Sequence, residues 1–138
     1  MEYVIDASVA VKWFIPEPQS DRAAFLLAEY RAHRLDFIAP DVLIAEVGNT
    51  LWKRSVLRGE IASAGAQAMY RDFIDLRIPL RSSSALAEQA LAIAVAHHHS
   101  LYDALYIALA LERKCDLISA DRTLVTKLSK AFPLLRLL

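Results

Sequence analysis

Apolar positions along the chain follow two different periods. Short β-prone runs at residues 3–5, 37–39, 78–80 and 117–118 predict strands, and the apolar tail 134–138 predicts a last one. Apolar residues at three- and four-residue spacing predict helices over residues 20–34, 41–57, 60–75, 84–98, 101–114 and 121–130. Because these strands alternate with helices, the pattern predicts an α/β fold with a largely parallel sheet.

Length and composition limit the kind of protein further. A chain of 138 residues has the size of one ordinary domain, so we expect residues 1–138 to form a single unit. Hydrophobic residues make up 56% of it, an excess that predicts apolar surface for self-association or for a partner. Cys115 is the one cysteine, which rules out an internal disulfide and favours a cytoplasmic location.

Neither a membrane segment nor a basic excess is visible. The longest wholly apolar run, residues 104–111, is far shorter than the roughly 18 residues of a membrane span, and no signal-peptide pattern opens the chain. We therefore expect no membrane association. Lysine plus arginine equals aspartate plus glutamate, so binding of nucleic acid would require basic residues gathered on one face or cations at an acidic site.

Two aspartates directly follow predicted strands. Asp6 comes after the first strand and Asp121 after the fourth. A parallel sheet brings such strand ends to one edge, where ligands bind in this class of fold. Each aspartate could instead be the N-cap of the helix that follows it.

Two further acids lie on predicted helices. Asp103 follows Ser100 at the spacing of a capping box, in which the two residues cap the helix reciprocally. The helix that they open is apolar on every side, so it should be buried, and the carboxylate would need a compensating partner. Glu46 lies inside the helix 41–57 with Asn49 three residues further on, and the alternative for this pair is a solvated helix face.

Four carboxylates at one sheet edge would repel each other unless protons or cations intervene. Oxygen ligands of this type suit Mg²⁺ or Mn²⁺. Two such ions can hold a phosphodiester, one activating water and the other stabilising the leaving oxygen. Sequence spacing leaves open whether the acids converge, whether one ion or two would bind, and what each carboxylate does.

Four segments resemble the motifs of PIN-domain ribonucleases, in the form of the VapC-type toxins of bacterial toxin–antitoxin pairs. They are VIDASVAVKWF (4–14), PDVLIAEVGN (40–49), SLYDALY (100–106) and LISAD (117–121), in the family's order and across most of the chain. The resemblance implies a single PIN-like domain with helices on both faces of its sheet. It also implies Mg²⁺- or Mn²⁺-dependent cleavage of RNA and a small antitoxin protein as partner. The apolar excess adds a homodimer to this expectation.

The same resemblance assigns roles to residues. It maps the acidic set onto Asp6, Glu46, Asp103 and Asp121. The three aspartates would be metal ligands, with Asp103 shared or in an outer position. Glu46 would bind metal or orient the attacking water.

Other residues of these motifs would support the acids. Ser8 would orient the first aspartate. Asn49 and Ser119 are expected to contact the metal ligands without binding the metal themselves. Lys12 and Arg122 lie close enough in sequence to hold substrate phosphate, with a solvated surface charge as the alternative for each.

Several other features favour different interpretations. The histidines at 97–99 would close on one ion only if their helix had already ended, because neighbours on a helix point about 100° apart. Trp13 and Trp52 are expected to pack in the core or an interface, and Cys115 to be structural. Three glycines cannot form a phosphate-binding loop. The remaining alternative is a PIN-like binding module without turnover, against which four intact acids argue.

Overall fold

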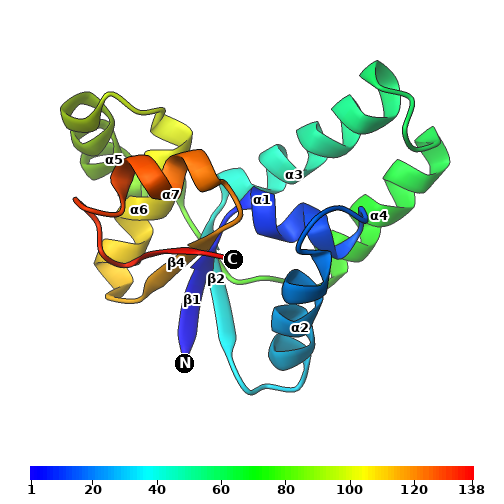
Figure 1. Ribbon diagram of the computed structural model, residues 1–138, viewed down its shortest axis with the longest axis horizontal. Coiled ribbons are helices and arrows are strands. Elements are labelled where there is room, and N and C mark those ends of the chain that lie inside the picture. Colours follow the sequence, from blue (N-terminus) through cyan, green and yellow to red (C-terminus); the bar gives the residue numbers. More distant parts are fainter.

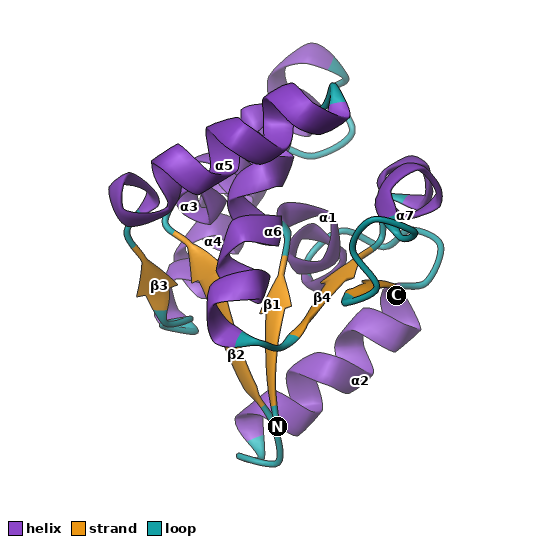
Figure 2. Ribbon diagram, turned by 90° about the vertical axis from the view of Figure 1, so that its left-hand side faces the viewer, coloured by secondary structure: helices purple, strands orange, loops and turns teal.

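The computed structural model describes residues 1–138 and contains five parallel strands in the order β3-β2-β1-β4-β5 (Figures 1 and 2). They are β1 (Glu2–Ile5), β2 (Asp36–Pro40), β3 (Leu80–Arg81), β4 (Asp116–Ser119) and β5 (Leu135–Leu137). Val4 of the central strand lies opposite Ile38 of β2 and Leu117 of β4. All three side chains are buried, as expected of a parallel sheet that is covered on both faces.

Seven α-helices connect these strands and cover the sheet. They are α1 (Ala7–Ala10), α2 (Ser20–Arg31), α3 (Val42–Trp52), α4 (Ser63–Asp75), α5 (Ser83–His97), α6 (Leu101–Arg113) and α7 (Arg122–Leu128). A 3-10 turn, Val11–Trp13 (η1), extends α1, and a π-helical turn, Lys53–Leu57, extends α3. Figure 1 shows α5, α6 and α7 on one side of the sheet and α1 to α4 on the other. The α/β architecture with helices on both faces is thereby confirmed.

One helical layer packs a continuous buried segment of α6 on the sheet, and the other packs a stack of aromatic rings. Every residue from 104 to 110 in α6 is buried, because this helix lies between the sheet and α5. On the opposite face Trp13 and Tyr30 stack on Phe37, with ring centroids 5.7 and 4.9 Å away. Trp13 Nε1 also donates to the Ala23 carbonyl at 3.0 Å. The prediction that Trp13 packs in the core is therefore confirmed.

Element boundaries differ from the sequence pattern where the backbone turns left-handed. The helix predicted for residues 20–34 ends at Arg31, and His33 adopts a φ of 56° before β2 begins. The helix predicted for 60–75 begins only at Ser63, after Gly59 with a φ of 63°. The strand predicted at 78–80 starts at Leu80, because Pro79 offers only its carbonyl, to Ala39 N. No helix has both the length and the apolar character needed to cross a membrane.

Candidate active site

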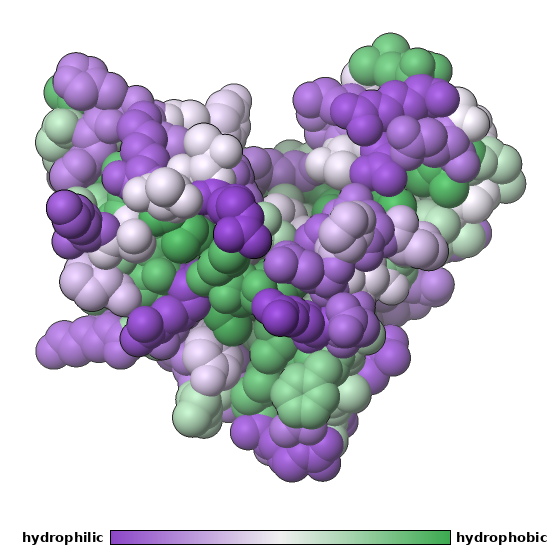
Figure 3. Space-filling view, in the orientation of Figure 1, coloured by the Kyte–Doolittle hydropathy of each residue, from purple (hydrophilic) through white to green (hydrophobic).

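The predicted acids border the edge of the sheet where the parallel strands end. Asp6 follows β1, Asp121 follows β4, Glu46 lies in α3 and Asp103 lies in the first turn of α6. The space-filling view shows the molecule hollowed between its two groups of helices, and β1 and β2 run toward this hollow (Figures 1 and 3). The topology therefore brings four segments that are far apart in sequence to one edge.

Asp6 is a buried carboxylate without a cationic partner. Only 7% of its surface is exposed. Its Oδ1 accepts from Ser8 Oγ at 2.5 Å and from Val9 N at 3.3 Å, so Asp6 caps α1, as one alternative predicted. Burial raises the pKa of Asp6 to about 6, hydrogen bonds from Ser119 and Ser8 oppose this rise, and the charge of Asp103 adds to it. At neutral pH the folded protein thus holds a desolvated negative charge, which is costly.

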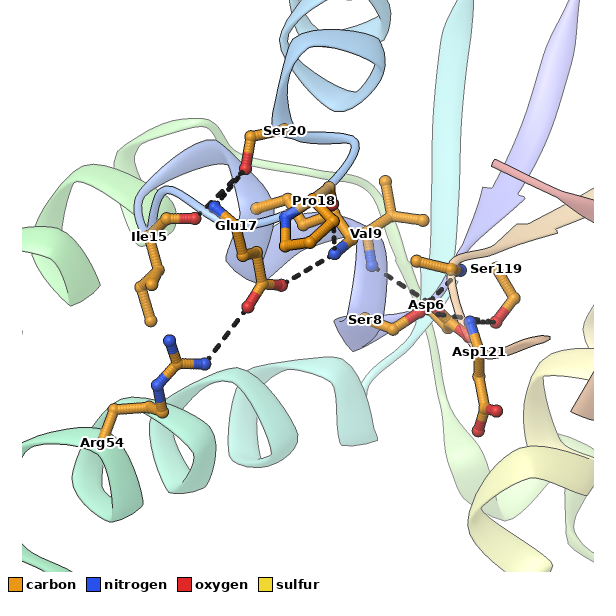
Figure 4. Close-up of polar contacts among 12 residues, drawn as sticks. Asp6, Ser8, Val9, Ile15, Glu17, Pro18, Ser20, Arg54, Ser119 and Asp121 are labelled. Atoms are coloured by element: carbon orange, nitrogen blue, oxygen red, sulfur yellow. Dashed lines mark hydrogen bonds and ion pairs between the residues drawn. The ribbon is translucent and has the colours of Figure 1, made fainter. Parts of the chain in front are cut away.

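Two serines connect the ends of β1 and β4 around this carboxylate (Figure 4). Ser8 Oγ donates to Asp6, accepts from Ala120 N at 2.8 Å, and lies 3.4 Å from Ser119 Oγ. Ser119 is fully buried, and its Oγ accepts from Asp121 N at 3.0 Å. The Ser8 contact is the one that the motif resemblance implies, and Ser119 touches both aspartate segments.

Glu46 is fixed by a residue of α6 that was not among the predicted site residues. The hydroxyl of Tyr106, a side chain buried in α6, donates to Glu46 Oε1 at 2.6 Å. Burial raises the pKa of Glu46, the bond from Tyr106 lowers it, and the charge of Asp103 raises it again. Burial and the nearby carboxylates also raise the pKa of Tyr106, so the phenol stays protonated as a donor. Its signal in the sequence is the three-residue spacing from Asp103, which puts both on one helix face.

Only half of the predicted capping box forms at Asp103. Ser100 Oγ accepts from Asp103 N at 3.2 Å and caps α6. The Asp103 carboxylate does not bond back to Ser100, and its Oδ2 lies 2.7 Å from His99 Nε2 instead. Because α5 ends at His97, His99 stands outside the helix and reaches the acidic edge. It is the second site residue to which the sequence pattern assigned no role.

Asp121 stands apart from the other three acids. It is exposed, and its Oδ1 accepts from Leu124 N at 3.1 Å, which makes it the N-cap of α7. The charge of Asp103 acts on both Asp6 and Glu46, whereas no hydrogen bond joins the Asp121 carboxylate to another of the predicted acids. Burial and charge thus couple three of the predicted acids, and Asp121 joins them only through its backbone bond to Ser119.

Lys12 and Asn49, two of the predicted supporting residues, contact groups other than the four acids. Lys12 Nζ donates to Glu17 Oε1 and to the Pro18 carbonyl, both at 2.9 Å, and Glu17 also pairs with Arg54 at 3.2 Å (Figure 4). Asn49 is exposed and lines a groove of about 530 Å³ between α3 and α4.

Arg122, the second residue predicted to bind phosphate, has no side-chain partner comparable to that of Lys12. Arg122 is exposed beside Asp121 and forms no ion pair. Of the two, Arg122 is therefore the one with a free charge.

The donor set suits a hard divalent cation. The acidic edge offers carboxylate oxygens, no lysine or arginine pairs with them, and the desolvated charge of Asp6 would be relieved by a positive ion. As they stand, no three acidic, histidine or cysteine side chains enclose a common point suited to a metal ion. Glu46, Asp103 and Asp121 are each turned toward a protein donor instead.

Comparison with known proteins defines the family to which this fold belongs. The family model for the PIN domain matches residues 3–127. The chain therefore belongs to the PIN-domain family, as the four motifs predicted. Over 131 residues it is 33% identical to Ribonuclease VapC3 of Pyrobaculum aerophilum, an alignment that covers 92% of this chain and 95% of the relative.

Solved structures agree with this assignment. The crystal structure of PAE2754 from Pyrobaculum aerophilum matches with a TM-score of 0.68 and 27% identity, covering 92% of this chain and 79% of that one. VapC20 of Mycobacterium tuberculosis, described as a sarcin-ricin loop cleaving toxin, matches with a TM-score of 0.64 at 16% identity over 86% and 87% of the two chains. VapBC2 of Rickettsia felis, bound to a promoter DNA fragment, matches with a TM-score of 0.66 at 15% identity. This match covers 100% of this chain and 98% of that one. The last two likenesses concern the fold alone.

Proposed function

We propose that the protein is a ribonuclease toxin of a toxin–antitoxin pair, with residues 1–138 as one nuclease domain. It would hydrolyse RNA phosphodiesters with Mg²⁺ or Mn²⁺ at the acidic edge. The observation that carries this proposal is Asp6, a buried carboxylate that has only hydroxyl and amide donors and lies under the repulsive charge of Asp103. Groups whose pKa is shifted by burial cluster at functional sites, and a cation bound here would compensate the buried charge. The identity of 33% to a ribonuclease, over 95% of that relative, supports the same conclusion.

The chain's own residues supply binding, orientation and water positioning. Asp6, Asp103 and Asp121 would hold the cation, which when bound activates water and stabilises the leaving oxygen. Ser8 and Ser119 fix the rotamer of Asp6 by hydrogen bonds. Glu46, held by Tyr106, keeps its second carboxylate oxygen free to orient the attacking water.

We further infer two protein partners and a cytoplasmic location, where RNA and an antitoxin would be encountered. Leu91 and Val95, 56% and 68% exposed, form an apolar face on α5 that would bury itself against a second copy of the chain. The groove between α3 and α4, lined by Gly48, Trp52 and Tyr70, has the apolar lining that an antitoxin helix needs. An arginine of such a segment could then pair with the carboxylates.

Purified protein incubated with defined RNAs, with Mg²⁺, Mn²⁺ or excess chelator, tests the proposal. Cleavage should require the cation and should be lost in Asp6→Asn. Asp36→Asn is the matched control, because Asp36 is exposed at the opposite end of the sheet. RNA binding without cleavage under every condition would instead identify a PIN-like binding module.

A further inference from the structure

The three consecutive histidines have three separate environments. His97 ends α5, and its ring lies edge-on to Phe132 with centroids 4.9 Å apart. His98 takes a left-handed φ of 51° and turns the chain out of the helix. His99 N donates to the Ala94 carbonyl at 3.1 Å, and Ser100 then caps α6. Fixed backbone on both sides of His99 directs its ring toward Asp103.

Both ring nitrogens of His99 have a partner. Nε2 lies 2.7 Å from Asp103 Oδ2, and Nδ1 lies 3.2 Å from Lys127 Nζ, which also donates to the His98 carbonyl at 2.7 Å. A lysine ammonium has donors only, so Nδ1 must accept. The proton of the neutral ring is then on Nε2, and the imidazole donates to Asp103. Lys127 thus selects the histidine tautomer that can hold the carboxylate.

We propose that His99 is a positioning residue of the acidic site, which holds Asp103 by Oδ2 in a tautomer fixed by Lys127 and leaves Oδ1 for a cation. This inference rests on the proposed function. Hydrogen-bond partners behind a metal ligand orient it, and their loss typically weakens metal binding by 10- to 100-fold. Without His99, the repulsion that acts between Asp103 and Asp6 would favour rotamers that turn the Asp103 carboxylate away.

The arrangement also explains why a lysine acts through a ring rather than directly. A lysine ammonium in contact with Asp103 would neutralise the carboxylate and compete with a cation for it. A neutral imidazole between them transmits the orientation and leaves the negative charge available. The side chain of His99 is only 16% exposed, which keeps water from replacing it as the donor.

Nitrogen-15 NMR of the metal-free wild-type protein tests the tautomer without relying on activity. The account predicts a protonated Nε2 and an unprotonated Nδ1 for His99. Lys127→Met should remove this preference, whereas Lys130→Met, at an exposed lysine three residues further along the chain, should retain it. Protonation of Nδ1 in the wild type would overturn the proposal.

Calorimetric titration with Mn²⁺ tests the effect on the site. His99→Phe keeps the ring and removes both nitrogens, so Mn²⁺ affinity should fall about 10-fold or more. His99→Gln can still donate near the position of Nε2 and should recover part of the loss, provided that circular dichroism shows both variants folded. Wild-type affinity in a folded His99→Phe would overturn the positioning role alone. A wild-type protein that binds no Mn²⁺ and cleaves no RNA would overturn the proposed function instead.

Discussion

Tyr106 and Glu46 join two helices that lie on opposite faces of the sheet, through a 2.6 Å hydrogen bond from the phenol to the carboxylate. Tyr106→Phe leaves the half-buried Glu46 without its donor. The free energy of unfolding should fall by about 2 kcal/mol, the usual effect of losing a hydrogen bond to a charged group. Urea denaturation of Tyr106→Phe, Glu46→Gln and the double variant measures the coupling. Strictly additive losses would mean that the bond contributes nothing of its own.

The stability of the metal-free protein should depend on pH through Asp6. Its pKa is 3.8 in the unfolded reference and about 6 when folded. The folded state therefore binds more protons between these values, and stability falls as pH rises through this window. The loss is at most about 3 kcal/mol, because a tenfold change in proton affinity corresponds to about 1.4 kcal/mol.

Asp6→Asn isolates this contribution, since the amide has no charge to desolvate. In chelator, the unfolding free energy of Asp6→Asn minus that of the wild type should increase from about pH 4 to about pH 7. Asp121→Asn is the comparison at the same edge of the sheet, and its free energy of unfolding should stay close to that of the wild type, because Asp121 is an exposed cap that asparagine replaces well. A difference between Asp6→Asn and the wild type that does not change with pH would show that the Asp6 carboxylate is not desolvated.

Lys12 and Arg122 should respond differently to substitution. Lys12→Met breaks the contacts to Glu17 and the Pro18 carbonyl, so it should lower the melting temperature and leave the KM for RNA nearly unchanged. Arg122→Ala removes an exposed charge beside the acidic edge and should raise the KM several-fold at unchanged stability. The reverse pattern would place the substrate phosphate near η1 rather than α7.

Charge introduced on α5 should disrupt self-association. Val95 is 68% exposed on the apolar face with Leu91, so Val95→Glu should shift the protein from dimer to monomer in light scattering, because a carboxylate would have to be desolvated in the interface. Glu88→Gln, at an exposed polar position of the same helix, is the control. A wild-type protein that stays monomeric at high concentration would contradict the dimer.

The fold could be predicted from the sequence because the burial of a helix or strand determines the spacing of its apolar residues. Residues 104–110 are apolar at every position, and they form the helix that is buried on all sides. The strand ends at Asp6 and Asp121 followed from the parallel topology. Boundaries failed at His33 and Gly59, where single left-handed residues turn the chain and hydrophobic pattern carries no information.

The candidate site was only partly readable, because contacts between segments are not encoded in local spacing. The pairing of Glu46 with Tyr106 spans 60 positions, and that of Lys127 with His99 spans 28. Sequence could place Asp103 in a capping box, but only the tertiary structure presents His99 to its carboxylate. Likewise, nothing in the sequence indicated that Lys12 has an acidic partner. Its ion pair with Glu17 depends on the turn between η1 and α2.

Cleavage of a defined RNA by the wild type, Asp6→Asn and Asp36→Asn, with Mn²⁺ and with excess chelator, tests the central claim most directly. The account predicts cleavage by the wild type and Asp36→Asn only when the cation is present, and none by Asp6→Asn under either condition, with all three proteins folded. Equal cleavage by folded Asp6→Asn, or full wild-type cleavage in chelator, would contradict it.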